Sequence, residues 1–315
     1  MTDTANADLI QLAHALQSLD SEKAHADSEQ LDTFSPLEIA TLMNREDQKV
    51  ALAVQKVLPD IGRAIKAATE ALRAGGRIIY IGAGTSGRLG VLDAAEVPPT
   101  FSAPPDMVIG LIAGGEAAMF RAQEGIEDDA AQGAEDLREI ALSADDFVVG
   151  LAASGRTPYV LGALGYAQKT GAKTAGISCN AQSPLAQLGD IPITPIVGPE
   201  ILSGSTRLKS GTAQKQILNM ISTGVMVRIG KCYGNRMVDL NASNKKLKAR
   251  AVNLVADLAN CASAAALQAL LSANWNIKAA ILMLSNATPI DAETAIKQVN
   301  AAKGHLRKAM EKNRV

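Results

Sequence analysis

Short apolar runs alternate with helical patterns through the middle of the chain. The segments between the runs carry apolar residues at helical spacing, whereas the runs themselves have the length of buried strands. Strands that alternate with helices indicate right-handed βαβ units, so we predict an α/β fold with a parallel five-stranded sheet flanked by helices. The five strands are expected at 77–82, 107–112, 146–151, 172–178 and 191–197.

Helical patterns also flank this alternating region. Ser35 is expected to cap a helix that has Pro36 at its first position. Apolar residues recur at helical spacing over 45–74, and Pro59 should divide that stretch. A long helix is expected to open within 204–215, where Gly211 costs about 1 kcal/mol relative to alanine and therefore suggests a close approach by another backbone or a ligand.

Beyond Asn241 the composition becomes alanine-rich and no strand is expected. Helices are predicted over 249–260, 263–274 and 276–286, and a capping box at 288–291 should open a last helix. We therefore expect three parts: an N-terminal arm and helix (1–44), a central α/β domain (45–240) and a small helical domain (245–315).

The first strand runs into a glycine-rich turn, Gly82-Ala-Gly-Thr-Ser-Gly-Arg88, and a helical pattern follows. The spacing of its glycines fits the dinucleotide-binding fingerprint, and Glu116 after the second strand could serve as the ribose ligand. However, a strand followed by Ser-Gly-Arg and a helix start recurs at Ser154-Gly-Arg156, and a dinucleotide fold needs no second copy. Two hydroxyl-rich loops at strand ends suit a compact, phosphorylated, polyhydroxylated ligand better.

Composition narrows the chemistry. The chain has 315 residues, a formal net charge of −1 and only nine aromatic residues, which argues against nucleic acid as a partner. Its three cysteines are scattered and its three histidines lie toward the ends, so a zinc site, a disulfide framework and a histidine-based triad are not expected. The polar, acidic start and the absence of a long apolar run predict a cytosolic protein without a membrane segment.

Acid–base chemistry must then fall to carboxylates or lysines. The acidic residues near predicted strand ends are Glu96, Glu116, Glu124, Glu127 and Glu200. Glu96 is expected to close a helix beside the uncharged run Val97-Pro-Pro99, and Glu127 lies where a helix is expected to be interrupted after Gly125. Periodicity alone does not select the pair.

Four motifs stand out along the chain: Gly82-Ala-Gly-Thr-Ser-Gly-Arg88, Asp93-Ala-Ala-Glu-Val-Pro-Pro-Thr100, Ala152-Ala-Ser-Gly-Arg-Thr-Pro158 and Gly198-Pro-Glu-Ile-Leu-Ser-Gly-Ser-Thr-Arg-Leu-Lys-Ser-Gly-Thr-Ala-Gln-Lys215. Together they resemble the N-acetylmuramic acid 6-phosphate etherases, and the likeness runs from about Leu31 to the C-terminus. The last motif is highly specific to this family and to the related glucokinase regulatory proteins. The resemblance implies a sugar isomerase (SIS) domain, a small ubiquitin-associated-like helical domain and a homodimer.

The reaction implied by the resemblance cleaves the D-lactyl ether of N-acetylmuramic acid 6-phosphate, giving N-acetylglucosamine 6-phosphate and D-lactate during cell-wall recycling. The family's catalytic glutamates match Glu96, as proton donor, and Glu127, which we expect to be the base for C2. A donor that stays protonated near neutral pH requires apolar surroundings. No metal, nucleotide or other cofactor is expected.

The phosphate is expected at the two hydroxyl-rich loops. The residues predicted to bind it are Gly84, Thr85, Ser86, Gly87, Arg88, Ser154, Gly155, Arg156 and Thr157. Two alternatives stay open. An aldose–ketose isomerase would use the same base for C2 and return the proton elsewhere, and a non-catalytic sugar-phosphate sensor would need the loops but not the glutamates.

Overall fold

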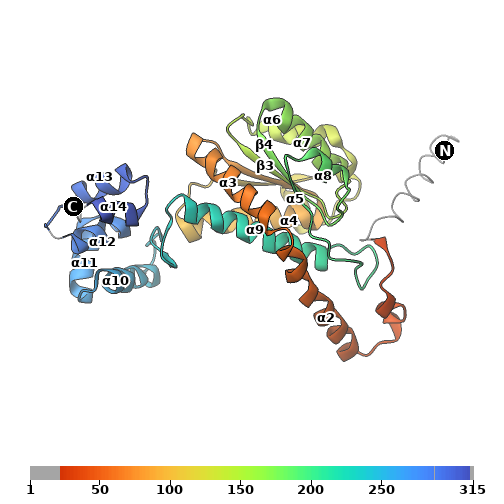
Figure 1. Ribbon diagram of the computed structural model, residues 1–315, viewed down its shortest axis with the longest axis horizontal. Coiled ribbons are helices and arrows are strands. Elements are labelled where there is room, and N and C mark those ends of the chain that lie inside the picture. Colours follow the sequence, from red (N-terminus) through yellow and green to blue (C-terminus); the bar gives the residue numbers. More distant parts are fainter. Residues whose placement is uncertain (1–21, 287, 313–315) are drawn as a thin grey trace. The chain divides into compact units, whose positions relative to one another are not determined.

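The computed structural model describes residues 22–286 and 288–312 (Figure 1). Predictions that concern residues 1–21 lie outside this range. By its internal contacts the chain forms two compact units. The first comprises residues 1–94 and 106–221, and the second comprises 95–105 and 222–315. This division differs from the predicted ranges near residues 100 and 240.

The first unit is built on a parallel sheet, as the alternating pattern predicts. Its strand order is β2-β1-β3-β4-β5. The strands match the predicted runs to within one residue at each end, except that the fifth is shorter. They are β1 (Ile78–Gly82), β2 (Val108–Ile112), β3 (Phe147–Leu151), β4 (Lys173–Ile177) and β5 (Ile191–Ile193). The predicted α/β fold is therefore confirmed.

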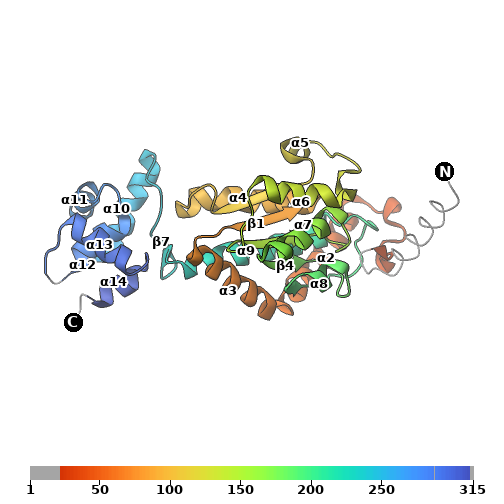
Figure 2. The same ribbon diagram turned by 90° about the horizontal axis from the view of Figure 1, so that it is seen from above.

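Burial on both faces explains why these strands read as unbroken apolar runs. Every residue of β1 and β3 is buried. Ile79 and Ile81 point to the face that is covered by α7 (Pro158–Thr170), whereas Tyr80 points to the face where α4 (Gly84–Phe101) crosses. The helices of the first unit thus lie on both faces of the sheet (Figure 2).

An arm and two helices precede the sheet. The arm contains the short 3-10 helices η2 (Ala26–Ser28) and η3 (Leu31–Thr33). Ser35 caps α2 (Pro36–Gln55) in a reciprocal capping box with Glu38, which confirms the predicted helix start. The chain then breaks before α3 (Leu58–Ala74), and Pro59 lies in the first turn of this new helix. That position is tolerated because the amide that proline lacks would have no partner there.

The remaining elements of the first unit connect the strands. Between β2 and β3 lie α5 (Gly115–Phe120), η4 (Ile126–Asp128) and α6 (Ala130–Glu139), and α6 packs against α7. The short helix α8 (Pro184–Leu188) precedes β5. The long helix α9 (Lys209–Arg228) follows the loop after β5, as predicted.

The second unit is mainly helical. After a small ladder of β6 (Cys232–Tyr233) and β7 (Arg236–Met237), its core is formed by α10 (Lys245–Ala259), α11 (Ser263–Ser272), α12 (Ile277–Ser285), α13 (Ala292–Ala301) and α14 (Leu306–Lys312). The prediction that a capping box at 288–291 opens the last helix is wrong. Asp291 itself caps α13, and α14 follows. Asp291 accepts the amide of Thr294, three residues on, which is the spacing of an N-cap.

Within the described residues, no single helix is both long and apolar enough to cross a membrane. Helices α10 and α11 reach such a composition only together, and they are bent by 110° relative to each other.

Candidate active site

A cavity of about 270 Å³ lies in the first unit, at the carboxyl ends of β1 and β3. These strands are neighbours and pair in parallel, with Gly82 opposite Leu151, so the loops that follow them emerge side by side. The lining residues are Glu22, Ala83, Gly84, Thr85, Ser86, Glu127, Leu151, Ala152, Ala153, Ser154, Thr157, Gly204 and Thr206. The two similar loops of the sequence therefore line one cavity, as expected.

Both loops present hydroxyl groups next to a helix start. Thr85 and Ser86 belong to the first turn of α4, and Thr157 is the N-cap of α7. The first amides of a helix have no partner within the helix and carry partial positive charge. Together with the hydroxyls of Ser154 and Thr157, they make the cavity suited to an anion such as a phosphate ester.

Ser86 is held by a residue from a distant part of the chain. Its hydroxyl donates to Gln214 Oε1 at 2.9 Å, and both side chains are buried. Gln214 lies on α9, in the last of the four etherase-like motifs, and its own Nε2 has no hydrogen-bond partner among the described residues. Gln214 was not among the predicted site residues, and the only sequence signal for it is the polar start of this helix.

Several predicted phosphate ligands do not line the cavity. The guanidinium of Arg88 donates to the carbonyl oxygens of Met119 at 3.0 Å and Ala118 at 2.6 Å, near the end of α5. The amide of Arg156 donates to Ser154 Oγ at 3.2 Å, so this residue shapes the loop through its backbone.

The two glycines of the Ser-Gly-Arg repeats are needed for close packing. A Cβ on Gly87 would lie 2.6 Å from the carbonyl oxygen of Gly82, and one on Gly155 would lie 2.3 Å from the side chain of Ser183. Gly155 also has a φ of +69°, which strains any residue with a side chain. Their direct contact with a ligand stays a prediction.

The two predicted catalytic glutamates occupy different settings. Glu127, in η4, is half-buried and lines the cavity. Glu96 does not line it: this residue lies about three turns beyond Ser86 along α4, and its side chain is exposed. The apolar surroundings expected for Glu96 are therefore absent in the single chain.

The prediction that Glu96 closes a helix is wrong, because α4 continues through Pro98 and Pro99 to Phe101. The two prolines remove backbone donors from the last turn. However, Val97 and Phe101 are one turn apart and both are buried. We attribute the continuation of the helix to the packing of these two side chains.

Of the other candidate carboxylates, Glu200 has a structural role. It is fully buried, and its two oxygens accept the amides of Lys209 and Ser210 at 2.9 Å each. It thereby caps α9 and orients the helix that carries Gln214. Burial raises the pKa of the nearby Cys179 thiol to about 12, so this cysteine is not a ready nucleophile. Glu116 and Glu124 are exposed and do not line the cavity.

A buried ionic cluster lies at the start of α9. Glu46 of α2 accepts hydrogen bonds from Lys209 Nζ at 3.0 Å and Lys49 Nζ at 2.6 Å, and its Oε2 lies 3.2 Å from His25 Nε2. Burial of Glu46 opposes its ionisation, but the donors Lys49, Lys209 and His25 outweigh burial and lower its pKa to about 2. Nothing in the sequence pattern predicts this cluster.

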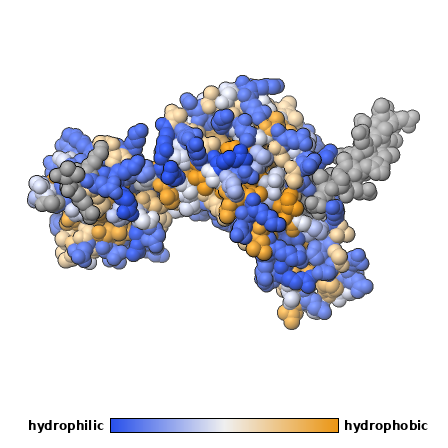
Figure 3. All heavy atoms as spheres, in the orientation of Figure 1, coloured by the Kyte–Doolittle hydropathy of each residue, from blue (hydrophilic) through white to orange (hydrophobic). Residues whose placement is uncertain are grey.

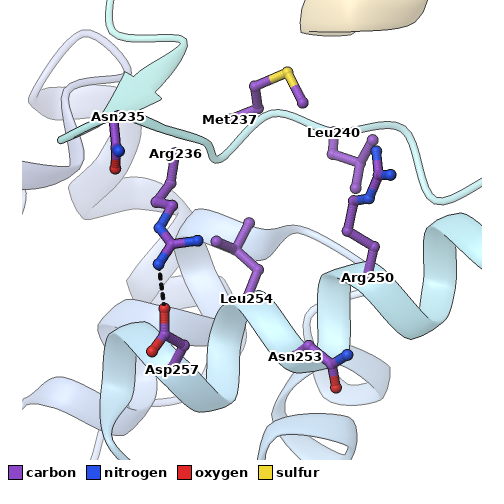
Figure 4. A pocket seen from close by; sticks show the side chains of 8 residues that line it. All are labelled: Asn235, Arg236, Met237, Leu240, Arg250, Asn253, Leu254 and Asp257. Atoms are coloured by element: carbon purple, nitrogen blue, oxygen red, sulfur yellow. Dashed lines mark hydrogen bonds and ion pairs between the residues drawn. The ribbon is translucent and has the colours of Figure 1, made fainter.

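A second hollow lies in the second unit, between β7 and α10 (Figure 4). Arg236 and Asp257 form an ion pair at 2.9 Å across one side of it, and both side chains are largely exposed. Leu240 and Leu254 also line it. This hollow has no buried polar group aimed into it and holds none of the predicted site residues. Across the described parts of the chain, no group of three or more histidine, cysteine, aspartate or glutamate residues is placed to hold a metal ion.

Three known family patterns match this chain. Residues 60–168 match the N-terminal SIS domain of glucokinase regulatory protein, residues 130–224 match the SIS domain, and residues 234–315 match the C-terminal lid domain of glucokinase regulatory protein. With the parallel sheet and the hydroxyl-lined cavity, these matches define a protein of the SIS-domain class.

Similarity to curated proteins is more specific. The chain is 51% identical over 302 residues to an N-acetylmuramic acid 6-phosphate etherase of Vibrio atlanticus, covering 96% of this chain and 98% of that protein. It is 54% identical to that of Pectobacterium atrosepticum, covering 94% and 97%. A solved phosphoheptose isomerase from Francisella tularensis is similar with a TM-score of 0.49 and 17% identity, covering 62% of this chain and all of that one. The chain belongs to the N-acetylmuramic acid 6-phosphate etherase family.

Proposed function

We propose that this protein cleaves the D-lactyl ether of N-acetylmuramic acid 6-phosphate and releases N-acetylglucosamine 6-phosphate and D-lactate. Such a reaction would recycle amino sugars of the cell wall. The observation that supports it best is the cavity itself: hydroxyls from two loops and the carboxylate of Glu127 converge at the ends of β1 and β3. The same chain is about half identical to etherases over nearly its whole length.

The phosphate is assigned to the loop side of the cavity. Ser86 and Thr85 would bind it from α4, and Ser154 and Thr157 would bind it from the loop before α7. The helix-start amides add hydrogen bonds that favour a dianion. Because the charge of the ligand is met by hydroxyls, amides and helix ends, this binding needs no metal ion and no nucleotide.

The reaction follows from the acidity of the open-chain sugar. The carbonyl at C1 acidifies the hydrogen on C2, and Glu127 removes it as a proton. The electron pair then forms the C2–C3 double bond while the C3–O bond to the lactyl group breaks, and Glu96 protonates the departing oxygen. Water adds at C3 and a proton returns to C2, which gives the amino sugar phosphate. General acid–base groups of this kind typically contribute about 10²–10⁴ in rate.

Glu96 is outside the cavity of its own chain, so we assign its role to a homodimer in which it enters the cavity of the partner. Exposed apolar side chains support association: Leu37 and Leu52 on α2 are 76% and 61% exposed, and Leu58 on α3 is 45% exposed. On the face shown in Figure 3, hydrophobic residues are exposed among the hydrophilic ones. A closed two-fold dimer would place two equivalent sites in one assembly.

The first experiment incubates the protein with N-acetylmuramic acid 6-phosphate in deuterated water and measures both D-lactate release and exchange at C2. Glu127→Gln should abolish both. Glu96→Gln should block lactate release but leave exchange at C2 in unreacted substrate. If exchange at C2 survives in Glu127→Gln and vanishes in Glu96→Gln, then Glu96 is the base and Glu127 the proton donor. If exchange survives in both variants, neither glutamate is the base for C2.

Mixing the two inactive variants tests the shared site. If each cavity combines Glu127 of one chain with Glu96 of the other, a mixed dimer has one intact site, and random exchange of subunits should restore about a quarter of the wild-type activity. No recovery after confirmed subunit exchange would place both glutamates in one chain. An isomerase would instead convert an aldose phosphate without releasing lactate, and a sensor would bind the sugar phosphate without turnover.

A further inference from the structure

The cavity contains a carboxylate that the etherase chemistry described above does not use. Glu22, from the arm before α2, lines the cavity together with Glu127. Its side chain is half-buried, and a Cβ built on Gly204 would lie 3.2 Å from Glu22 Oε2. The carboxylate is therefore packed against the loop that precedes α9, not extended into solvent.

The arm that carries Glu22 is fixed three residues later. His25 is buried, and its Nε2 lies 3.2 Å from Glu46 Oε2, in the ionic cluster with Lys209. Its Nδ1 accepts the amide of Asp27 at 3.2 Å. Three residues span at most about 10 Å, so the His25 anchor confines Glu22 to the neighbourhood of the cavity.

The charges in the cavity indicate which part of a ligand Glu22 meets. The described residues that line it include two carboxylates but no lysine, arginine or histidine. A carboxylate repels a phosphate dianion, whereas it accepts hydrogen bonds well from neutral hydroxyl groups. The groups of the cavity that suit an anion are the hydroxyls of Ser154 and Thr157 and the helix-start amides.

We propose that Glu22 is a direct sugar contact, which accepts hydrogen bonds from the hydroxyl groups of the bound sugar phosphate and is held in place by His25. The identity of that sugar rests on the proposed function, but the contact itself requires only a phosphorylated, polyhydroxylated ligand. Glu22 thereby distinguishes a sugar phosphate from phosphate alone, and His25 is a positioning residue.

The test compares the binding of two probes by calorimetry, N-acetylglucosamine 6-phosphate and inorganic phosphate. Glu22→Gln should weaken binding of the sugar phosphate about tenfold to a hundredfold, because hydrogen bonds to a charged acceptor are among the stronger ones. The same variant should bind inorganic phosphate as well as wild type, or several-fold more tightly, because a like charge has been removed. A merely structural role would weaken both probes together.

Two further variants sharpen the test. Glu29→Gln removes an exposed carboxylate from the same arm and should change neither affinity. His25→Ala should reproduce the selective loss for the sugar phosphate. Unchanged sugar-phosphate binding in Glu22→Gln, or equal weakening of both probes, would overturn the proposal. If wild type binds the sugar phosphate but releases no lactate from the muramic acid substrate, the proposed function fails, and the binding comparison still decides the role of Glu22.

Discussion

Replacing Lys209 by methionine should strongly destabilise the first unit. Lys209 and Lys49 both donate to Glu46, at 3.0 and 2.6 Å, but the Lys209 side chain is 3% exposed whereas that of Lys49 is 58% exposed. Removing one partner of a buried ion pair leaves an uncompensated charge and costs about 3–5 kcal/mol. An exposed pair contributes only about 0–1 kcal/mol. Lys49→Met is therefore the matched control.

The assay is urea unfolding at neutral pH, followed by circular dichroism. Fluorescence of Trp275, the sole tryptophan, reports the second unit separately. Lys209→Met should lower the midpoint of the dichroism transition far more than Lys49→Met, with the slope unchanged. Adding Glu46→Leu to Lys209→Met should recover much of the loss, because the stranded charge is removed. Equal, small effects of the two lysine variants would refute the reasoning.

The same cluster predicts a dependence on pH. The pKa of Glu46 is lowered from 4.5 to about 2 in the folded protein, so its ionised form stabilises the fold at pH values above about 4.5. This contribution, on the order of 3 kcal/mol, is lost as the pH falls from about 4.5 to about 2. The stability gap between wild type and Glu46→Gln should therefore narrow across this window. A gap that stays constant down to pH 2 would contradict the assignment.

Three further predictions concern the site and the fold. Gln214→Glu should weaken binding of inorganic phosphate about tenfold or more in calorimetry, because Gln214 accepts the hydroxyl of Ser86 and the variant places a negative charge beside this proposed phosphate ligand. Unchanged binding would separate Ser86 from the phosphate. Gly211→Ala should leave the free energy of unfolding unchanged or raise it by up to about 1 kcal/mol, because the added Cβ would lie at an ordinary contact distance of 3.5 Å from Thr85. Gly87→Ala should destabilise the protein, because its Cβ would lie only 2.6 Å from the backbone of Gly82. A thermal unfolding midpoint that is lower for Gly211→Ala than for Gly87→Ala would contradict both expectations. Chelation should leave lactate release intact, and a loss that one divalent ion restores would show a metal requirement.

The sheet and the cavity follow from local patterns in the sequence. Strands buried on both faces produce unbroken apolar runs, and the loops after two adjacent parallel strands must emerge at one edge. The sequence therefore predicts that Ser86 and Ser154 belong to one site. The rule that crossovers are right-handed does not by itself determine which strands are neighbours, so the order β2-β1-β3-β4-β5 is a finding of the structure.

The residues that support the cavity could not be predicted in the same way. Ser86 and Gln214 are 128 positions apart, and Glu46 and Lys209 are 163 apart, so their partnership exists only in the folded chain. The interpretation of Gly211 also needed the folded structure. Its cost within a helix suggested a close approach, but the nearest atom to its Cβ position is a side-chain carbon at an ordinary contact distance.

The predictions for the two glutamates show what a single chain contributes to its site. The resemblance implies catalytic roles for both, but Glu127 lines the cavity whereas Glu96 is exposed outside it. A proton donor needs surroundings that favour its neutral form, and an exposed carboxyl group on the surface of one chain does not have them. If Glu96 is the donor, those surroundings must come from association with a partner chain. The mixing experiment therefore tests the dimer and the mechanism together.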